Sequence, residues 1–111
     1  MILPTKIQFA DDKLKKAFYD LKQGQNNEKE LYKFLERAFK DIEQNGFYGI
    51  QVPKNLIPKS YTQKYKVTNL WKYDLPNAWR LLYSIKGNQL LVISIVIEWM
   101  SHKDYEKRFK Y

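Results

Sequence analysis

Residues 79–101, WRLLYSIKGNQLLVISIVIEWMS, decide the fold because they contain two strand patterns joined by a turn signal. Apolar side chains at positions 79, 81, 83 and 85 alternate with positions 80, 82 and 84, which is the period of a β-strand with two different faces. Gly87-Asn88 is a two-residue hairpin signal. The following strand, Gln89 to Trp99, is apolar on both faces, so we expect it at the centre of a sheet.

Two amphipathic helices are expected before this hairpin. Apolar residues at positions 14, 17, 18 and 21 have helical spacing, and Gly24 can end that helix. A second apolar stripe runs from Leu31 to Ile42. Asn27 and Glu30 stand before it at the spacing of a capping box, and Gly46 follows its end. The short connection between the two patterns predicts an antiparallel helical hairpin.

The remaining segments complete an α+β domain. We expect a short strand at Ile7 and Phe9, an extended loop over 46–64 with one strand near Ile50 to Val52, and a strand over 67–75. Ser101 can cap a closing helical segment. The prediction is a single domain, residues 1–111, in which the helical hairpin packs on an antiparallel sheet of three or four strands.

Composition excludes several functional classes. The 111 residues contain no cysteine and one histidine, so disulfides and thiolate metal sites are excluded and a structural zinc site is not expected. We expect no metal and no cofactor. The N-terminal residues show no signal peptide, and the longest apolar run, Leu90 to Ile97, falls short of the about 20 residues that span a bilayer. These features predict a soluble, cytoplasmic protein without a membrane partner.

The net charge of +8 is concentrated in the second half of the chain. Residues 1–45 carry a net charge of +1, whereas residues 46–111 carry +7. No acid occurs between Glu43 and Asp74, and five lysines in that interval alternate with tyrosine, phenylalanine and tryptophan. Cations near aromatic rings suit a phosphate backbone with unstacked bases, so this stretch predicts polyanion binding. The alternative is a lysine-rich surface that only maintains solubility.

Arg80 and His102 are the residues with the clearest chemical potential. A buried arginine without a partner is costly, so Arg80 is expected to face solvent or to have a partner. RNA cleavage through the 2′-hydroxyl needs a cation on the phosphate and a proton acceptor, which arginine and histidine supply without a metal. Glu98 or Tyr105 would share the acid–base work. The alternatives are an Arg80 ion pair with Asp74 or Glu98, and packing roles for Tyr105 and Phe109.

Two segments, LPNAWRLLYSIKGNQLLVISIVIEW and SHKDYEKRF, resemble the RelE/ParE superfamily of toxins from toxin–antitoxin pairs. That pattern has a helical hairpin, a strand with Arg-x-x-Tyr, a turn, an apolar strand, and then a histidine or basic residue and a tyrosine. Arg80 and Tyr83 match the first pair, and His102 and Tyr105 match the second. The layout covers nearly the whole chain, with residues 69–105 as its specific part.

The resemblance implies a ribosome-dependent mRNA endonuclease held inactive by a small cognate antitoxin. It places Arg80 on the scissile phosphate and gives His102 and Tyr105 acid–base or stacking roles. The resemblance does not decide the oligomeric state of the protein, which could be a homodimer or a toxin–antitoxin hetero-oligomer. Two other functions are also left open: a ParE-like inhibitor of a topoisomerase without enzymatic activity, and an inert basic RNA-binding module. The resemblance further makes four lysines candidates for RNA binding: Lys54, Lys59, Lys66 and Lys72.

Overall fold

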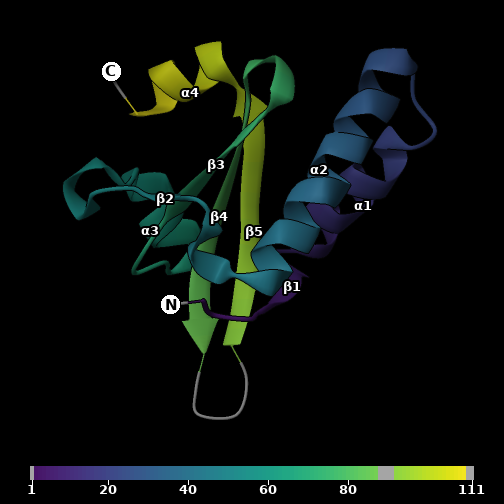
Figure 1. Cartoon of the computed structure of the whole chain (residues 1–111). Coiled ribbons are helices and arrows are strands. Elements are labelled where there is room, and N and C mark those ends of the chain that lie inside the picture. Colours follow the sequence, from purple (N-terminus) through teal and green to yellow (C-terminus); the bar gives the residue numbers. More distant parts are fainter. Residues whose placement is uncertain (1, 88–91, 110–111) are drawn as a thin grey trace.

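The computed structural model describes residues 2–87 and 92–109 and shows helices on both sides of one five-stranded sheet (Figure 1). The order of strands in the sheet is β1-β5-β4-β3-β2. The elements along the chain are β1 (Lys6–Phe9), α1 (Asp12–Leu21), α2 (Asn26–Gln44), the 3-10 turn η1 (Gly46–Tyr48), β2 (Ile50–Gln51), η2 (Lys54–Leu56), α3 (Lys59–Tyr65), β3 (Trp71–Leu75), η3 (Pro76–Ala78), β4 (Trp79–Gly87), β5 (Val92–Ser101) and α4 (His102–Phe109).

The expected helical hairpin is present. Asp11 caps α1, because its side chain accepts a hydrogen bond from the Leu14 backbone N–H at 2.7 Å. The chain turns through Gly24, and α2 begins at Asn26. The capping carboxylate of α2 is Glu28, which accepts from the Gln25 backbone N–H, so the predicted capping role of Asn27 and Glu30 is wrong by two residues.

The sheet is mixed rather than antiparallel, and it has five strands instead of three or four. β1 pairs with β5 in parallel, with Lys6 opposite Ile93 and Phe9 opposite Val96, while the other three pairings are antiparallel. β5 is an interior strand between β1 and β4, in keeping with its apolar character, but the central strand of the five is β4. The neighbour of β5 other than β4 is β1, which comes from the opposite end of the sequence, and no local pattern indicates that pairing. The predicted turn residue Asn88 lies outside the described residues.

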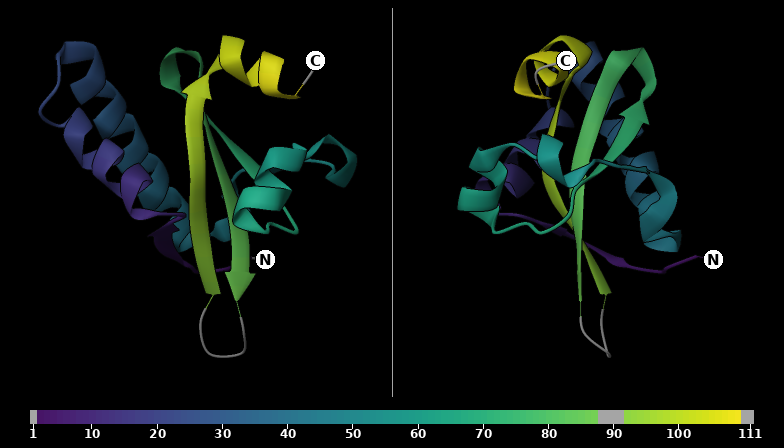
Figure 2. Two further views of the ribbon diagram at one scale, coloured as in Figure 1. Left: turned by 180° about the vertical axis from the view of Figure 1, so that it is seen from behind. Right: turned by 90° about the vertical axis from the view of Figure 1, so that its left-hand side faces the viewer.

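Helices cover both faces of the sheet, with α1 and α2 on one face and α3 and α4 on the other (Figure 2). The alternation of β4 assigns its side chains as predicted: Leu81 and Tyr83 pack under α1 and α2, and Leu82 packs under α3 and α4. We call the second side the α3/α4 face. Its buried residues are Val52, Tyr61, Val67, Leu70, Leu82, Ile97, Met100, Tyr105 and Phe109.

Residues 46–64, predicted as an extended loop with one strand, contain two 3-10 turns, the short strand β2 and the helix α3. α3 follows Pro58 and ends at Tyr65, and its C-cap residue, Lys66, has a left-handed backbone with φ of 57°. Only Tyr61 of this seven-residue helix is buried. A helix this short, fixed by one side chain, leaves no periodic stripe in the sequence.

A β-bulge determines which face Glu98 occupies. Tyr83 lies opposite Val96 while Leu82 lies opposite Glu98, so Ile97 is the extra residue in β5. Glu98 therefore shares the α3/α4 face with Leu82 instead of pointing toward α1 and α2. Within the described residues, no helix is both long enough and apolar enough to cross a membrane.

Candidate functional site

Arg80 on β4 lies within hydrogen-bond distance of His102, the first residue of α4. Figure 1 shows β3, β4 and α4 meeting at this end of the sheet. Register brings them there, because Trp79 pairs with Ser101 and His102 is the next residue, the first of α4. Asp74 on β3 pairs directly with Arg80 on β4. The proximity of arginine and histidine therefore results from the length of the β4–β5 hairpin, as the sequence pattern predicted.

The Arg80 side chain is largely buried, with 16% of its surface exposed. Its Nε lies 3.1 Å from Asp74 Oδ1, an ion pair whose geometry leaves the buried Nε without a hydrogen bond. Nη1 donates to the Trp79 carbonyl oxygen at 3.1 Å, and Nη2 is 3.0 Å from His102 Nδ1. The predicted alternative of an Arg80–Asp74 pair is thus confirmed, and the pair lies on the same side of the sheet as the imidazole.

The contacts of His102 fix its tautomer. A guanidinium only donates hydrogen bonds, so His102 Nδ1 accepts from Arg80. The proton of the neutral ring is then on Nε2, which lies 2.8 Å from Glu106 Oε1. The lone pair that would accept a proton in catalysis is therefore the one that Arg80 occupies.

Lys72 adds a second cation on Asp74. Its Nζ is 3.3 Å from Asp74 Oδ1 and lies 5.5 Å from the centre of the Tyr105 ring. Tyr105 itself is buried and stacks on Phe109 with ring centres 4.4 Å apart. The packing of Phe109 is confirmed, and Tyr105 lies in the same apolar cluster, beneath the lysine.

Glu98 forms a separate polar cluster between α3 and α4. Its Oε2 accepts from the Tyr61 hydroxyl at 2.5 Å and from Arg108 Nη1 at 2.8 Å. Burial, followed by the hydrogen bond to Glu98, raises the pKa of Tyr61 well above its ordinary value. Among the contacts of the described residues, Glu98 has none with Arg80 or His102. These bonds instead connect α3 and α4 to β5.

The other predicted lysines surround α3. Lys54 is in η2, Lys59 begins α3, and Lys66 is its C-cap residue, all with exposed side chains. Because α3 packs on the α3/α4 face, these cations share that side of the sheet with Arg80 and Lys72. Asp74 is the single acid in the whole interval from residue 44 to residue 97. Both side chains that it pairs with are cations of the candidate site.

Tyr83, the second member of the Arg-x-x-Tyr pair, has a positioning role that the sequence did not show. It is fully buried under α1 and α2, and burial raises its pKa to about 12. Its hydroxyl donates to the Gly46 carbonyl at 2.7 Å and accepts from the Gly49 N–H at 2.9 Å. One buried oxygen thereby fixes both ends of η1 against the sheet.

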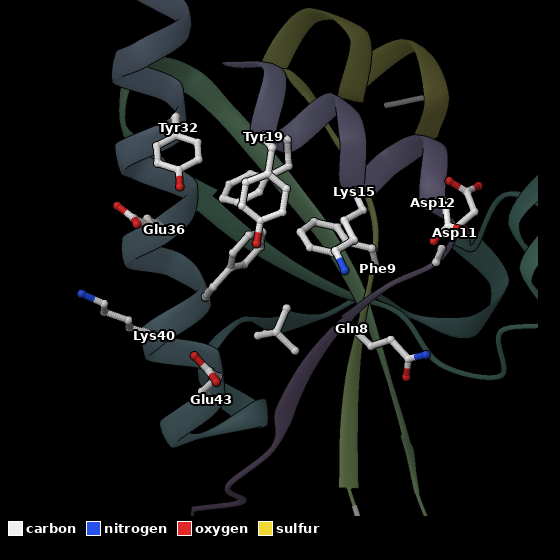
Figure 3. Close-up of a pocket in the computed structure, with 14 residues that line it drawn as sticks. Gln8, Phe9, Asp11, Asp12, Lys15, Tyr19, Tyr32, Glu36, Lys40 and Glu43 are labelled. Carbon is white, nitrogen blue, oxygen red and sulfur yellow. The ribbon is translucent and has the colours of Figure 1, made fainter. Parts of the chain in front are cut away.

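A hollow lies away from Arg80 and His102, beside β1 and between α1 and α2 (Figure 3). Its volume is about 810 Å³, and Phe9 and Phe18 line it, with Glu36 and Lys40 among its charged residues. None of the predicted site residues is part of its lining. Across residues 2–87 and 92–109, no three histidine, aspartate or glutamate side chains gather closely enough to hold a metal ion.

No family model, curated protein or solved structure matches the chain.

Proposed function

We propose that this protein is a RelE-like toxin of a toxin–antitoxin pair, which cleaves mRNA on the ribosome in the cytoplasm and is inhibited by a small antitoxin. The observation that carries the proposal is the 3.0 Å contact between Arg80 Nη2 and His102 Nδ1 on a lysine-rich face. The helical hairpin followed by the strand of Arg80 and then by His102 supports the RelE/ParE resemblance. The RNA would lie across the α3/α4 face.

The first step is exchange of one anion for another. Asp74 holds Arg80 and Lys72 at 3.1 and 3.3 Å, and its side chain is 47% exposed. A carboxylate and a phosphate present similar oxygen acceptors to a guanidinium. In the proposed complex the scissile phosphate takes the position of the Asp74 carboxylate. Arg80 then stabilises the negative charge that develops in the transition state.

Binding of the phosphate also releases the base. Once Nη2 donates to a phosphate oxygen, His102 Nδ1 loses its donor and its lone pair faces the RNA. Nδ1 accepts the proton of the 2′-hydroxyl, O2′ forms a bond to phosphorus, and the bond from phosphorus to O5′ breaks. The products are a 2′,3′-cyclic phosphate and a 5′-hydroxyl end. Glu106 holds the Nε2 proton and thereby orients the ring.

The departing O5′ needs a proton. In the proposal, Lys72 Nζ donates this proton, because the Lys72 ammonium pairs with the same Asp74 oxygen as Arg80 and would lie beside the phosphate that replaces it. Glu98 and Tyr105, both predicted as acid–base residues, would instead hold α4, and with it His102, in place. Glu98 does so through Arg108, and Tyr105 through its stacking on Phe109.

Message cleavage by translating ribosomes tests the proposal. Purified wild type, Arg80→Ala, His102→Ala and the control Arg37→Ala are added, and the message is mapped by primer extension. Arg37 on α2 is a suitable control because its change removes the same charge from an exposed side chain 3.8 Å from Asp41. We expect about 10²-fold slower cleavage or worse for Arg80→Ala, and near-normal rates for Arg37→Ala.

Other outcomes identify the rival functions. Equal cleavage by wild type and Arg80→Ala would remove Arg80 from the mechanism. Binding of RNA without cleavage by the wild type would indicate an inert RNA-binding module. DNA damage instead of shortened messages in induced cells would indicate inhibition of a topoisomerase.

A further inference from the structure

Tyr48 is an aromatic side chain presented to solvent at the edge of the sheet, where it stacks on Tyr73 on the α1/α2 side and shares a hollow with Lys72 and Asp74 of the proposed phosphate site. It is 56% exposed, one of the large apolar side chains left on the surface. One face of its ring is stacked on Tyr73, with centres 5.4 Å apart and planes 20° from parallel. The Tyr73 hydroxyl donates a hydrogen bond to Asp41 at 2.6 Å, which fixes the ring of Tyr73 beneath that of Tyr48. Because Tyr73 covers one face of the Tyr48 ring and the side chain is mostly exposed, the opposite face of the ring is available to a ligand.

The backbone that carries Tyr48 is held rigidly. Tyr83 bonds Gly46 and Gly49 on either side of it, and the Asn45 side chain accepts from the Phe47 N–H at 3.1 Å. Gly49 packs so closely on β3 that an added Cβ would lie 2.5 Å from the Lys72 carbonyl oxygen. A ring held in this way loses little conformational freedom when a flat ligand stacks on it.

A shallow hollow is lined by this ring and by two residues of the proposed phosphate site, Lys72 and Asp74. It has a volume of about 260 Å³. Asp74 Oδ1 is the atom that pairs with both Arg80 and Lys72. A phosphate in place of that carboxylate would therefore lie at one end of the hollow, with the ring of Tyr48 at its border.

The combination favours a nucleotide over a protein side chain as the occupant. The neighbouring exposed Ile50 would also suit an apolar protein surface. However, the Asp74 carboxylate in the lining is paired with Lys72 and with Arg80, which lies outside the lining, and these three side chains carry a net charge of +1. The nearby Asp41 is engaged by Tyr73 and Arg37. A ligand with an anionic group and a flat ring meets both features, as an unpaired nucleotide does.

We propose that Tyr48 is a base-stacking residue that binds the base of a nucleotide adjoining the phosphate held by Arg80 and Lys72. This inference rests on the proposed function for the phosphate position and adds the position of the base. Stacking requires an unpaired base, so the site selects single-stranded RNA. Because every base has a ring face, the site tolerates different bases.

The test measures binding of short single-stranded RNA, methylated at the 2′-hydroxyls to block cleavage, by fluorescence anisotropy. We expect Tyr48→Ala to weaken binding about 5- to 150-fold, the equivalent of about 1–3 kcal/mol per stacked base. Tyr48→Trp should retain affinity, and Tyr48→Leu, which keeps apolar contact with Tyr73, should not. The control is Tyr19→Ala, a tyrosine on α1 that is 51% exposed and contacts the ring of Phe18.

An abasic nucleotide placed at successive positions of the RNA identifies the stacked base. At one position it should weaken binding to the wild type by the same factor as Tyr48→Ala, and cause no further loss in that variant. The slope of affinity against salt should stay the same in Tyr48→Ala, because stacking neutralises no phosphate. Circular dichroism and thermal unfolding verify that each variant is folded.

The outcomes separate this inference from the proposed function. If RNA binding depends on Arg80 but not on Tyr48, the base-stacking inference is overturned and the phosphate site stands. If Tyr48→Ala weakens binding while Arg80→Ala cleaves normally, the stacking site stands and the cleavage mechanism fails. A wild type that binds no RNA overturns the base-stacking inference, while message cleavage on translating ribosomes decides the proposed function separately.

Discussion

Replacing Asp74 by asparagine is expected to strengthen RNA binding, although the change removes two ion pairs from the folded protein. In the proposed complex the phosphate displaces the Asp74 carboxylate from Arg80 and Lys72. Asparagine keeps the size of the side chain and removes its charge, so both cations are available without that competition. A purely structural role for Asp74 predicts the opposite result, because loss of its contacts would disorder both cations and weaken binding.

The structure sets the size of this effect. The Asp74 side chain is 47% exposed, so its pairs at 3.1 and 3.3 Å belong to the range of about 0.2–1 kcal/mol measured for surface ion pairs. Loss of about 1 kcal/mol of competition corresponds to about fivefold tighter binding. Removal of this one negative charge raises the net positive charge that meets the RNA by one, which should also steepen the slope of log affinity against log salt by about 0.7 for one further phosphate neutralised.

Anisotropy titrations of the methylated RNA at several salt concentrations measure both quantities. The matched control is Asp20→Asn, which removes one negative charge from the exposed pair between Asp20 and Lys16 on α1. Any gain in the control reports the general effect of net charge. Affinity of Asp74→Asn equal to or below that of Asp20→Asn, in a protein shown to be folded, would refute the idea that this carboxylate occupies the phosphate position.

Two predictions concern the buried hydroxyl of Tyr83. Tyr83→Phe should lower the free energy of unfolding by about 1–3 kcal/mol in urea titrations, because it leaves the Gly46 carbonyl and the Gly49 N–H without their partner. The control, Tyr19→Phe, should change it by less than about 0.5 kcal/mol. Equal urea midpoints for the two variants would contradict the role of the Tyr83 hydroxyl in holding η1. Tyr83 should also make stability fall between about pH 10 and pH 12, by up to about 1.4 kcal/mol per pH unit, since the unfolded chain releases this proton near pH 10 while the folded one, with a pKa of about 12, retains it. Burial also raises the pKa values of Tyr61 and Tyr73, so Tyr83→Phe should reduce the slope by the contribution of Tyr83 alone, and an unchanged slope would count against the raised pKa.

The local parts of the fold could be predicted from the sequence, and the long-range parts could not. Periodicity identified the helical hairpin and the two faces of β4, because each face buries different side chains over adjacent residues. The parallel pairing of β1 with β5 left no such trace, since Ile7 and Phe9 look the same beside any apolar strand. α3 was missed because it buries only Tyr61.

The candidate site shows the same division. The neighbourhood of Arg80 and His102 followed from counting residues along the hairpin, and an Arg80 pair with Asp74 was among the predicted alternatives. The position of Glu98 could not be predicted, because β5 is apolar on both faces and gives no sign of the bulge at Ile97. Its partners, Tyr61 and Arg108, come from segments far away in the sequence.

The parallel pair at the sheet edge has a consequence for the order in which the molecule assembles during synthesis. Lys6 to Phe9 are synthesised well before their partners, residues 93–96, so this pairing must wait until β5 has been made. The contacts between α1 and α2 are local in the sequence and do not depend on β5. Because Arg80 and His102 meet only when β4 and β5 pair, the candidate site is assembled only after His102 has been synthesised.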